Sequence, residues 1–269
     1  MSDKAFEHLN YGVEGDVAHV LLHRPDKHNG LTLDMIDGLS RLADRAAKDR
    51  SLRAVVISGD GESFCSGLDF ASTADQRSRI MRALVPKRRS AANTFQAASW
   101  AWRNVPVPVI AVISGHCYGG GLQIALGADF RFAAPSADFS IMEARWGLIP
   151  DMSLSASIAQ LTTIDVAKRL TMTGETFSAA EALGWGLVSA VADDPLAEAH
   201  KLIAAVRERS PDSVAASKRL FEQTWYNGSR FAFPVEQALQ IRLLSGKNHA
   251  IARKAGLTRQ APSFTDRQF

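Results

Sequence analysis

The chain has 269 residues, of which 46% are hydrophobic and 22% are charged, and this is the composition of a globular protein that buries its own core. The formal net charge of +3 selects neither nucleic acid nor an anionic metabolite as the ligand, and the apolar runs are too short to cross a bilayer. The N-terminus shows no leader pattern, and the two cysteines, Cys65 and Cys117, have neither disulfide nor metal-ligand spacing. Both observations predict a cytoplasmic protein.

The first third of the chain alternates strand-like and helix-like segments. Residues 17–22 predict a strand that ends before Arg24, and residues 54–57, apolar throughout, predict a strand buried on both faces of a parallel sheet. Between them, apolar residues recur at helical spacing, and Thr32 or Asp34 is a typical N-cap for that helix. This alternation predicts an α/β fold.

The middle of the chain continues the pattern. A buried strand, a glycine-rich turn, a short helix and two short strands are predicted over residues 108–113, 115–121, 122–126, 129–133 and 138–141. After Pro150 helical patterns dominate, apart from a strand at 187–191. We therefore divide the chain into a β/α core, residues 1–195, and a helical C-terminal region, residues 196–269, which we expect to dock on a partner subunit.

Two glycine-centred turns, residues 63–69 and 115–123, each follow a buried strand. Glycines let backbone amides approach a ligand closely, and a helix N-terminus adds a positive field. Two such turns are able to aim two N–H groups at one oxygen, which is what an enolate or another oxyanion needs. The alternative is that each glycine cluster is only a tight turn.

Other site classes fit these turns poorly. Neither turn has the glycine, lysine and hydroxyl spacing of a nucleotide-binding loop or a dinucleotide fingerprint. Residues 61–65 lack the closing glycine of the serine-hydrolase elbow. No metal-ligand cluster is apparent, and the basic segment 77–89 lacks the interleaved aromatic residues that stack on bases. We therefore expect no metal, no redox cofactor and no nucleic-acid partner.

An ordered series of sequence blocks resembles the enoyl-CoA hydratase/isomerase (crotonase) superfamily. The blocks cover nearly the whole chain, at residues 24–29, 64–69, 119–121, 139–143, 146–150, 173–175, 179–182, 186–188 and 264–267. The resemblance implies a spiral of ββα units and acyl-CoA substrates, with coenzyme A as part of the substrate rather than a cofactor. It also implies homotrimers or dimers of trimers, assembled through the C-terminal helices.

The resemblance assigns roles to individual residues. The backbone N–H groups of Leu68 and Gly120 match the family's oxyanion hole, which holds the thioester oxygen as it gains charge. The family's hydratases hold a water between two carboxylates, one just after the glycine triplet and one twenty residues later. The later one is present as Glu143, but Gln123 stands at the earlier position. A neutral amide neither accepts nor delivers a proton in this pH range.

We therefore favour double-bond isomerisation of an enoyl- or dienoyl-CoA over hydration. The family's simpler enoyl-CoA isomerases use one glutamate, at the Glu143 position. The spacing from Glu143 to Asp151 matches the acidic pair of its dienoyl-CoA isomerases, although these also carry an acid at the Gln123 position. Two alternatives stay open: an enoyl-CoA hydratase (a lyase) of fatty-acid oxidation, in which Gln123 orients the water, and an acyl-CoA-binding protein without turnover.

Structural roles are the alternatives for the same side chains. Glu143 is then an acid paired with Arg145, Asp151 caps a helix that starts near Ser153, and Gln123 supports the loop. Outside this group, His116 and Tyr118 are expected to be structural.

Four residues match regions where the family binds CoA. Arg24 and Lys27 lie where the nucleotide is held, and Phe264 and Arg267 complete the site of a neighbouring subunit. Three further aromatic residues line either the acyl pocket or the core: Phe95, Trp100 and Trp102.

Overall fold

The structure, a computed structural model, describes residues 3–86 and 91–269. Two predictions fall partly outside the described residues. The expected lack of a leader involves Met1 and Ser2, and the basic segment includes residues 87–89. Within those two ranges, no helix combines the length and the apolar character that a membrane crossing requires.

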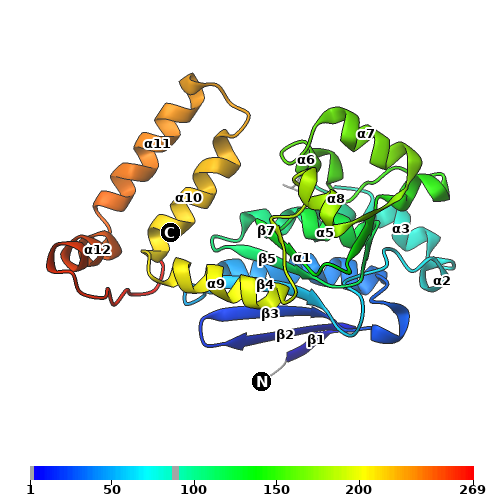
Figure 1. Ribbon diagram of the computed structural model, residues 1–269, viewed down its shortest axis with the longest axis horizontal. Coiled ribbons are helices and arrows are strands. Elements are labelled where there is room, and N and C mark those ends of the chain that lie inside the picture. Colours follow the sequence, from blue (N-terminus) through cyan, green and yellow to red (C-terminus); the bar gives the residue numbers. More distant parts are fainter. Residues whose placement is uncertain (1–2, 87–90) are drawn as a thin grey trace.

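A seven-stranded sheet runs through the molecule in the order β1-β2-β3-β4-β5-β7-β10 (Figure 1). Its first three strands pair antiparallel, and all later neighbours pair parallel. The strands are β1 (Asp3–Phe6), β2 (Leu9–Glu14), β3 (Val17–Leu22), β4 (Ala54–Gly59), β5 (Val109–Ile113), β7 (Phe130–Ala133) and β10 (Ala190–Val191). As predicted, β5 is buried along its whole length, because it lies inside the parallel part of the sheet.

A second sheet carries one of the glycine-rich turns. Its order is β6-β8-β9, and its strands are β6 (His116–Tyr118), β8 (Asp138–Ser140) and β9 (Thr176–Ser178). β6 starts shortly after the end of β5, so the chain leaves the large sheet and enters the small one directly. The turn between the two sheets therefore has a fixed position.

Helices cover the sheets and form the C-terminal region (Figure 1). The core α-helices are α1 (Leu33–Lys48), α2 (Phe70–Thr73), α3 (Arg77–Ala83), α4 (Thr94–Trp100), α5 (Gly120–Leu126), α6 (Leu154–Ile158), α7 (Ile164–Thr173) and α8 (Ala179–Gly184). The later ones are α9 (Pro195–Arg207), α10 (Pro211–Thr224), α11 (Ser229–Leu244) and α12 (Lys247–Thr258). Three short 3-10 helices are η1 (Pro25–Lys27), η2 (Ala101–Asn104) and η3 (Met142–Trp146).

The first α-helix forms where its sequence pattern predicts it. Thr32 is its N-cap, and the hydroxyl of Thr32 accepts a hydrogen bond from the N–H of Met35 at 3.2 Å. The apolar face of α1, which includes Met35, Leu39 and Leu42, is buried in the main core. Burial of that face, rather than helix propensity alone, holds α1 against the sheet.

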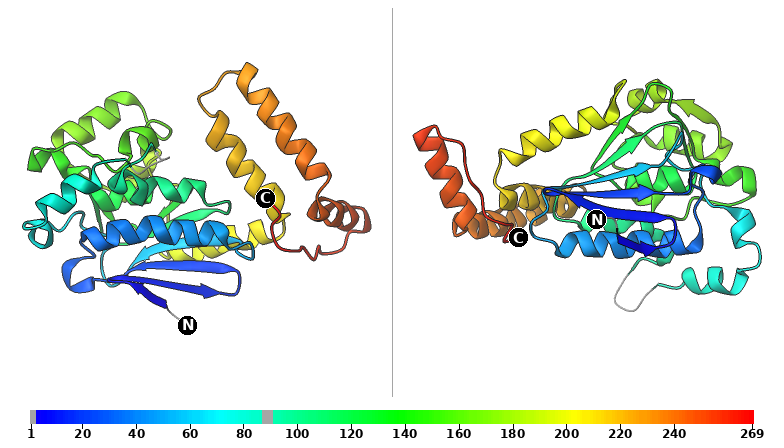
Figure 2. Two further views of the ribbon diagram at one scale, coloured as in Figure 1. Left: turned by 180° about the vertical axis from the view of Figure 1, so that it is seen from behind. Right: turned by 90° about the horizontal axis from the view of Figure 1, so that it is seen from below.

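The division of the chain into residues 1–195 and 196–269 stays a prediction, and the packing of the first C-terminal helices bears on it. Helix α9 packs on β5 and β7, and its residues Ala199 and Ile203 share a buried cluster with Val56 and Ile110 of the sheet. By contrast, α10, α11 and α12 extend away from the sheet, as two views show (Figures 1 and 2). Helix α9 therefore belongs with the core, and the projecting part starts at α10.

Three further details differ from the predictions. Strands β1, β2, β6 and β9 were not predicted. Strands β1, β6 and β9 have only three or four residues, whereas β2 has six and begins with alternating buried and half-buried positions. The strand predicted at 187–191 is shorter in the structure and consists of β10 alone. The N–H of Leu187 donates to the carbonyl of Ala182, so it does not pair with a neighbouring strand. Helix α5 begins at Gly120, two residues earlier than predicted, and this places Gly120 at the helix N-terminus.

Candidate active site

The two glycine-centred turns pair with each other. Cys65 and Cys117 form an isolated parallel β-bridge, in which the N–H of Cys65 donates to the carbonyl of His116 and the N–H of Tyr118 donates to the carbonyl of Cys65, both at 2.9 Å. A Cβ atom placed on Gly67, whose φ is +93°, would lie 3.7 Å from the backbone nitrogen of Gly120. The loops that follow β4 and β5 therefore meet at residues 67 and 120.

Two backbone amides remain open at this meeting point. The groups on either side of Leu68 are used, because the N–H of Leu31 donates to the carbonyl of Gly67 at 2.8 Å and the N–H of Asp69 donates to the carbonyl of Leu31 at 3.0 Å. Gly120 is the first residue of α5, so its N–H precedes the first intrahelical hydrogen bond. Within the described residues, neither the N–H of Leu68 nor that of Gly120 donates to a protein acceptor.

Both residues line one cavity of about 370 Å³. The polar side chains at this cavity are few: Ser66, Thr73, Gln123, Glu143 and Asp151. The other side chains that line it are apolar or aromatic: Leu68, Phe70, Ile80, Leu84, Phe95, Met142, Trp146, Leu148, Ile149 and Met152. A mostly apolar cavity with a few convergent polar groups is the usual form of a small-molecule site.

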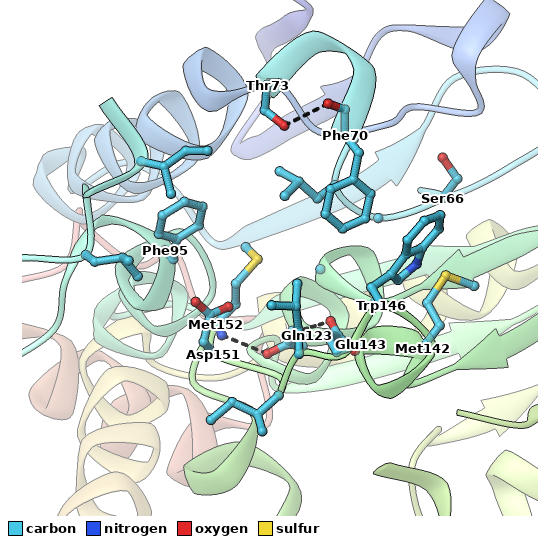
Figure 3. Close-up of a pocket in the computed structure, with 18 residues that line it drawn as sticks. Ser66, Phe70, Thr73, Phe95, Gln123, Met142, Glu143, Trp146, Asp151 and Met152 are labelled. Carbon is cyan, nitrogen blue, oxygen red and sulfur yellow. Dashed lines mark hydrogen bonds between the residues drawn. The ribbon is translucent and has the colours of Figure 1, made fainter. Parts of the chain in front are cut away.

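Glu143 and Gln123 come from different elements and meet in this cavity. Strand β8 runs into η3, which carries Glu143, and α5 carries Gln123. The Gln123 Nε2 atom donates to Glu143 Oε1 at 2.6 Å, and the backbone N–H of Met152 donates to Gln123 Oε1 at 2.8 Å. Both hydrogen bonds are visible in Figure 3. Glu143 Oε2 is buried and has no hydrogen-bond partner among the described residues.

Burial dominates the electrostatics of the two carboxyl groups. It raises the pKa of Glu143, while a hydrogen bond from the backbone N–H of Glu143 itself and the one from Gln123 oppose this rise, and the charge of nearby Asp151 adds to it. Burial also raises the pKa of Asp151. The cavity therefore contains two acids for which the neutral form is more accessible than usual, as proton transfer near neutral pH requires.

The structure tests the structural alternatives for these side chains. Asp151 is not a helix cap, because the N-cap of α6 is Ser153. Within the described ranges, no ion pair joins Glu143 to Arg145. Gln123 is 1% exposed and bonded at both ends of its amide, so it does support the chain at Met152 while it also contacts Glu143.

His116 and Tyr118 hold the small sheet together, as expected for structural residues. The imidazole Nδ1 of His116 lies 2.7 Å from one carboxylate oxygen of Asp138, and the Tyr118 hydroxyl donates to the other at 2.6 Å. Strands β6 and β8, which carry these residues, are neighbours in that sheet. These side chains fix the turn from which Gly119 and Gly120 follow.

The predicted CoA-binding residues do not line this cavity. The Arg24 guanidinium pairs with Asp69 at 2.7 Å and donates to the carbonyl of Gly30 at 2.9 Å, so it braces the loop that carries Leu68. Lys27 is exposed in η1. Whether these two side chains contact CoA stays a prediction.

The C-terminal pair lies elsewhere. Phe264 lies beside Arg53, whose guanidinium carbon is 6.0 Å from the ring centre. Arg267 is 1% exposed, and its guanidinium donates to the backbone carbonyls of Ala47 and Asp49. Arg267 therefore attaches the C-terminal tail to the core of its own chain. A role of Phe264 or Arg267 at a neighbouring subunit's CoA site stays a prediction.

Several residues of the cavity were not predicted. Phe70 and Trp146 form a tilted aromatic pair with ring centres 4.7 Å apart, and Trp146 is 59% exposed (Figure 3). The only sequence feature that could have revealed them is their position. Phe70 follows Asp69 directly, and Trp146 lies three residues after Glu143, within one helical turn. Of the three aromatic residues left open, Phe95 lines the cavity and Trp102 lies in the core. In the described part of the chain, no three His, Cys, Asp or Glu side chains are arranged to hold a metal.

The chain is similar to known proteins along almost its whole length. Residues 12–267 match the family described as enoyl-CoA hydratase/isomerase. The chain is 32% identical to the mitochondrial Delta(3,5)-Delta(2,4)-dienoyl-CoA isomerase of Mus musculus over 234 residues, which cover 81% of this chain and 69% of that protein. It is 26% identical to enoyl-CoA hydratase EchA19 of Mycobacterium tuberculosis over 264 residues, which cover 94% of each.

Solved structures agree. A putative enoyl-CoA hydratase/isomerase from Mycobacterium abscessus superposes with a TM-score of 0.85 at 30% identity and covers 96% of this chain and 100% of its own. A putative enoyl-CoA hydratase from Streptomyces coelicolor A3(2) gives a TM-score of 0.87 at 28% identity, with coverage of 98% and 96%. The predicted crotonase-type α/β fold with C-terminal helices is thereby confirmed. On the match along almost its whole length, the chain belongs to the enoyl-CoA hydratase/isomerase family.

Proposed function

We propose that the protein is an isomerase that moves a double bond along the acyl chain of an enoyl- or dienoyl-CoA. The observation that carries this proposal is the contact between Glu143 and Gln123, 2.6 Å apart in an apolar cavity. The group next to the central carboxylate is a neutral amide. Glu143 is thus equipped to move a proton. Hydration by the family's two-carboxylate arrangement needs a second acid at position 123, and this acid is missing.

The first step is removal of a carbon-bound proton. With the thioester oxygen between the N–H groups of Leu68 and Gly120, an ionised Glu143 takes a proton from the carbon α or γ to the carbonyl. The electron pair of the broken C–H bond moves into the acyl chain and places negative charge on the thioester oxygen. Two hydrogen-bond donors stabilise this enolate in a mostly apolar cavity.

The second step returns the proton to a different carbon. The enolate electrons form the new C–H bond, the proton comes from Glu143 or from Asp151, and the double bond has moved. When Asp151 delivers the proton, Glu143 keeps the one it removed, and a proton then passes from Glu143 to the ionised Asp151, directly or through solvent, before the next turnover. No water is consumed and no group leaves. Because burial raises the pKa of Asp151, its neutral form is available as a proton donor, which suits a longer transfer along a dienoyl chain.

A second candidate is hydration, and one observation favours it. Asp151 lines the cavity together with Glu143 and contributes to the raised pKa of Glu143, so a second carboxyl group is present, although not at the Gln123 position. Relatives carry both activities in their names: a dienoyl-CoA isomerase at 32% identity and an enoyl-CoA hydratase at 26%. Isomerisation agrees better with the neutral Gln123.

Turnover of a thioester panel distinguishes the candidates. Enoyl- and dienoyl-CoA esters of several chain lengths are incubated with the protein, and the products are identified by mass spectrometry and NMR. A product of unchanged mass with a shifted double bond supports isomerisation, and a gain of one water supports hydration. Binding of the esters without conversion of any of them would instead support the acyl-CoA-binding alternative and contradict both enzymatic candidates.

Glu143→Gln tests the central assignment. Loss of a general base costs roughly 10²–10⁴ in rate, so isomerase turnover should fall by that factor. The matched control is Glu14→Gln, at an exposed position at the end of β2, which should retain full turnover. Full turnover by Glu143→Gln would remove Glu143 from the mechanism.

We also infer that copies of this chain assemble through the C-terminal helices into a trimer or a dimer of trimers. Helix α11 has no buried residue, and exposed apolar side chains lie along α10, at its C-cap Trp225 and along α11: Phe221, Trp225, Phe231, Phe233, Ile241 and Leu244. Exposed apolar surface of this kind is typical of an interface. Native mass spectrometry measures the subunit number, and a monomer at micromolar concentration would contradict the inference. The cytoplasmic location is likewise a proposal from the sequence.

A further inference from the structure

The orientation of the Gln123 amide is fixed by the main chain. The group that faces one end of this amide is the backbone N–H of Met152, which donates a hydrogen bond and accepts none. The oxygen of Gln123 must therefore face Met152, and its NH2 group must face Glu143 (Figure 3). A flipped amide would set two donors against each other in a site where Gln123 is 1% exposed.

This orientation makes the two oxygens of Glu143 unequal. Oε1 accepts the hydrogen bond from Gln123 at 2.6 Å, whereas Oε2 is buried without a partner among the described residues. A carboxylic acid accepts hydrogen bonds better at its carbonyl oxygen than at its hydroxyl oxygen. The donor at Oε1 therefore selects Oε1 as the carbonyl oxygen whenever Glu143 is protonated.

We propose that Gln123 is a positioning residue: oriented by the N–H of Met152, it reserves Oε1 of Glu143 as a hydrogen-bond acceptor and leaves Oε2 as the oxygen that carries the proton. The geometry also makes Gln123 a support for the ionised base, since a donor stabilises a carboxylate. The link to turnover rests on the proposed isomerase function, whereas the position of the proton in the resting protein does not.

The same geometry explains what a glutamate at position 123 would do. The N–H of Met152 would bind one oxygen of that glutamate, and its other oxygen would meet Oε1 of Glu143. Two acceptors in contact must share a proton, so the pair would titrate in two coupled steps. Gln123 avoids this coupling and leaves Glu143 to titrate alone beside Asp151.

The test follows the titration of Glu143 by NMR in the resting protein. The protein is labelled with glutamate carrying ¹³C at the side-chain carboxyl, and the Glu143 signal is assigned by its loss in Glu143→Gln. In Gln123→Met, which has similar volume and no donor, the midpoint of Glu143 should move to higher pH by about one unit. In Gln260→Met, at an exposed position after α12, the midpoint should stay at the wild-type value.

Two further measurements keep the proposal testable if Gln123→Met does not fold. In wild type, the side-chain amide protons of Gln123, labelled with ¹⁵N, should shift with the same midpoint as the Glu143 carboxyl carbon. In Gln123→Glu, a two-step titration should replace the single step. An unchanged Glu143 midpoint in folded Gln123→Met, or amide protons that do not respond to that titration, would overturn the proposal.

Failure of the proposed function gives a different result. If the protein isomerises no thioester, the NMR titrations still decide whether Gln123 directs the proton of Glu143. If it does isomerise, the acidic limb of kcat/KM in Gln123→Met should move to higher pH with the NMR midpoint. A rate loss without that pH shift would show that Gln123 acts only through packing.

Discussion

The two walls of the cavity are built in opposite ways. One wall consists of main chain: Leu68 and Gly120 offer N–H groups that no protein acceptor uses within the described residues, while the groups beside Leu68 are bonded to Leu31. The other wall consists of side chains, in which Gln123 is bonded to both Glu143 and Met152. The first wall has unused donors, whereas in the second the amide of Gln123 is bonded at both ends.

This difference separates what the fold fixes from what a single substitution changes. Backbone donors are set by the path of the chain, so the charge-stabilising wall withstands changes of side chain as long as the turns keep their shape. The proton-transfer wall depends on which side chain stands at 123, 143 and 151. One fold is thereby able to serve several reactions of acyl thioesters, with the reaction chosen on the side-chain wall.

After Glu143→Gln, the largest expected effect comes from distorting the main-chain wall at Gly119. This residue has φ of 50° and ψ of −121°, a conformation that only glycine adopts readily, and an added Cβ would lie 3.3 Å from Glu143 Oε1. Gly119→Ala should displace the N–H of Gly120. Loss of one oxyanion donor costs roughly 10²–10³ in kcat, and steady-state kinetics on the preferred thioester measures it.

A matched control separates this effect from a general effect of replacing glycine. At Gly256, in α12, an added Cβ meets no atom within 4 Å. Gly256→Ala should keep full kcat and stabilise the helix by about 0.5–1 kcal/mol. If Gly119→Ala is folded by circular dichroism and turns over at the wild-type rate, the main-chain wall does not hold the reacting charge.

The main-chain wall was also the more predictable of the two. Buried strands at 54–57 and 108–113, each followed by glycines, indicate turns at one edge of a parallel sheet, and the structure has both turns there. The spacing of such motifs is local, so a sequence reveals it. The limits of α9 were less visible, because its packing on β5 and β7 joins residues that are far apart in the chain.

The side-chain wall was predictable in its residues but not in its contacts. Gln123, Glu143 and Asp151 follow from a family pattern, and all three line the cavity. The N–H of Met152 carries no sequence signal, since every residue except proline has one, yet it orients Gln123. Arg24 and Arg267 look like ligand-binding cations in sequence, whereas in the structure their guanidinium groups bond within their own chain.

The next effect in size concerns Asp151 as the returning acid. Asp151→Asn should lower kcat for dienoyl-CoA by roughly 10², the lower end of general acid catalysis, and should affect simple enoyl-CoA less. Because the charge of Asp151 contributes to the raised pKa of Glu143, its removal should also move the acidic limb of kcat/KM to lower pH. That direction is opposite to the one expected for Gln123→Met.

Rate profiles with both substrate classes measure this prediction. Asp193→Asn, at an exposed position before α9, is the matched control and should change neither rate nor profile. An equal loss on enoyl- and dienoyl-CoA would argue against a specific acid role for Asp151. An acidic limb that moves upward would contradict the electrostatic link between the two carboxyl groups.

The smallest expected effect is on stability: Asp151→Asn should stabilise the fold although it lowers activity. Burial raises the folded-state pKa of Asp151 above its unfolded value of about 3.9, so the fold favours the neutral acid. Its favourable contribution is complete below the unfolded pKa and is lost as the pH rises through the folded pKa. At pH 7.5, Asp151→Asn should therefore raise Tm slightly.

The gain should shrink as the pH falls toward about 4, where the unfolded carboxyl is also protonated. Thermal melts of wild type, Asp151→Asn and Asp193→Asn at pH 4 and 7.5 measure it. An equal gain at both pH values would assign the stabilisation to packing instead of charge. If the gain is confined to high pH, the side-chain wall holds its acid at a cost to the fold, which is expected where a carboxyl group is kept for proton transfer rather than for stability.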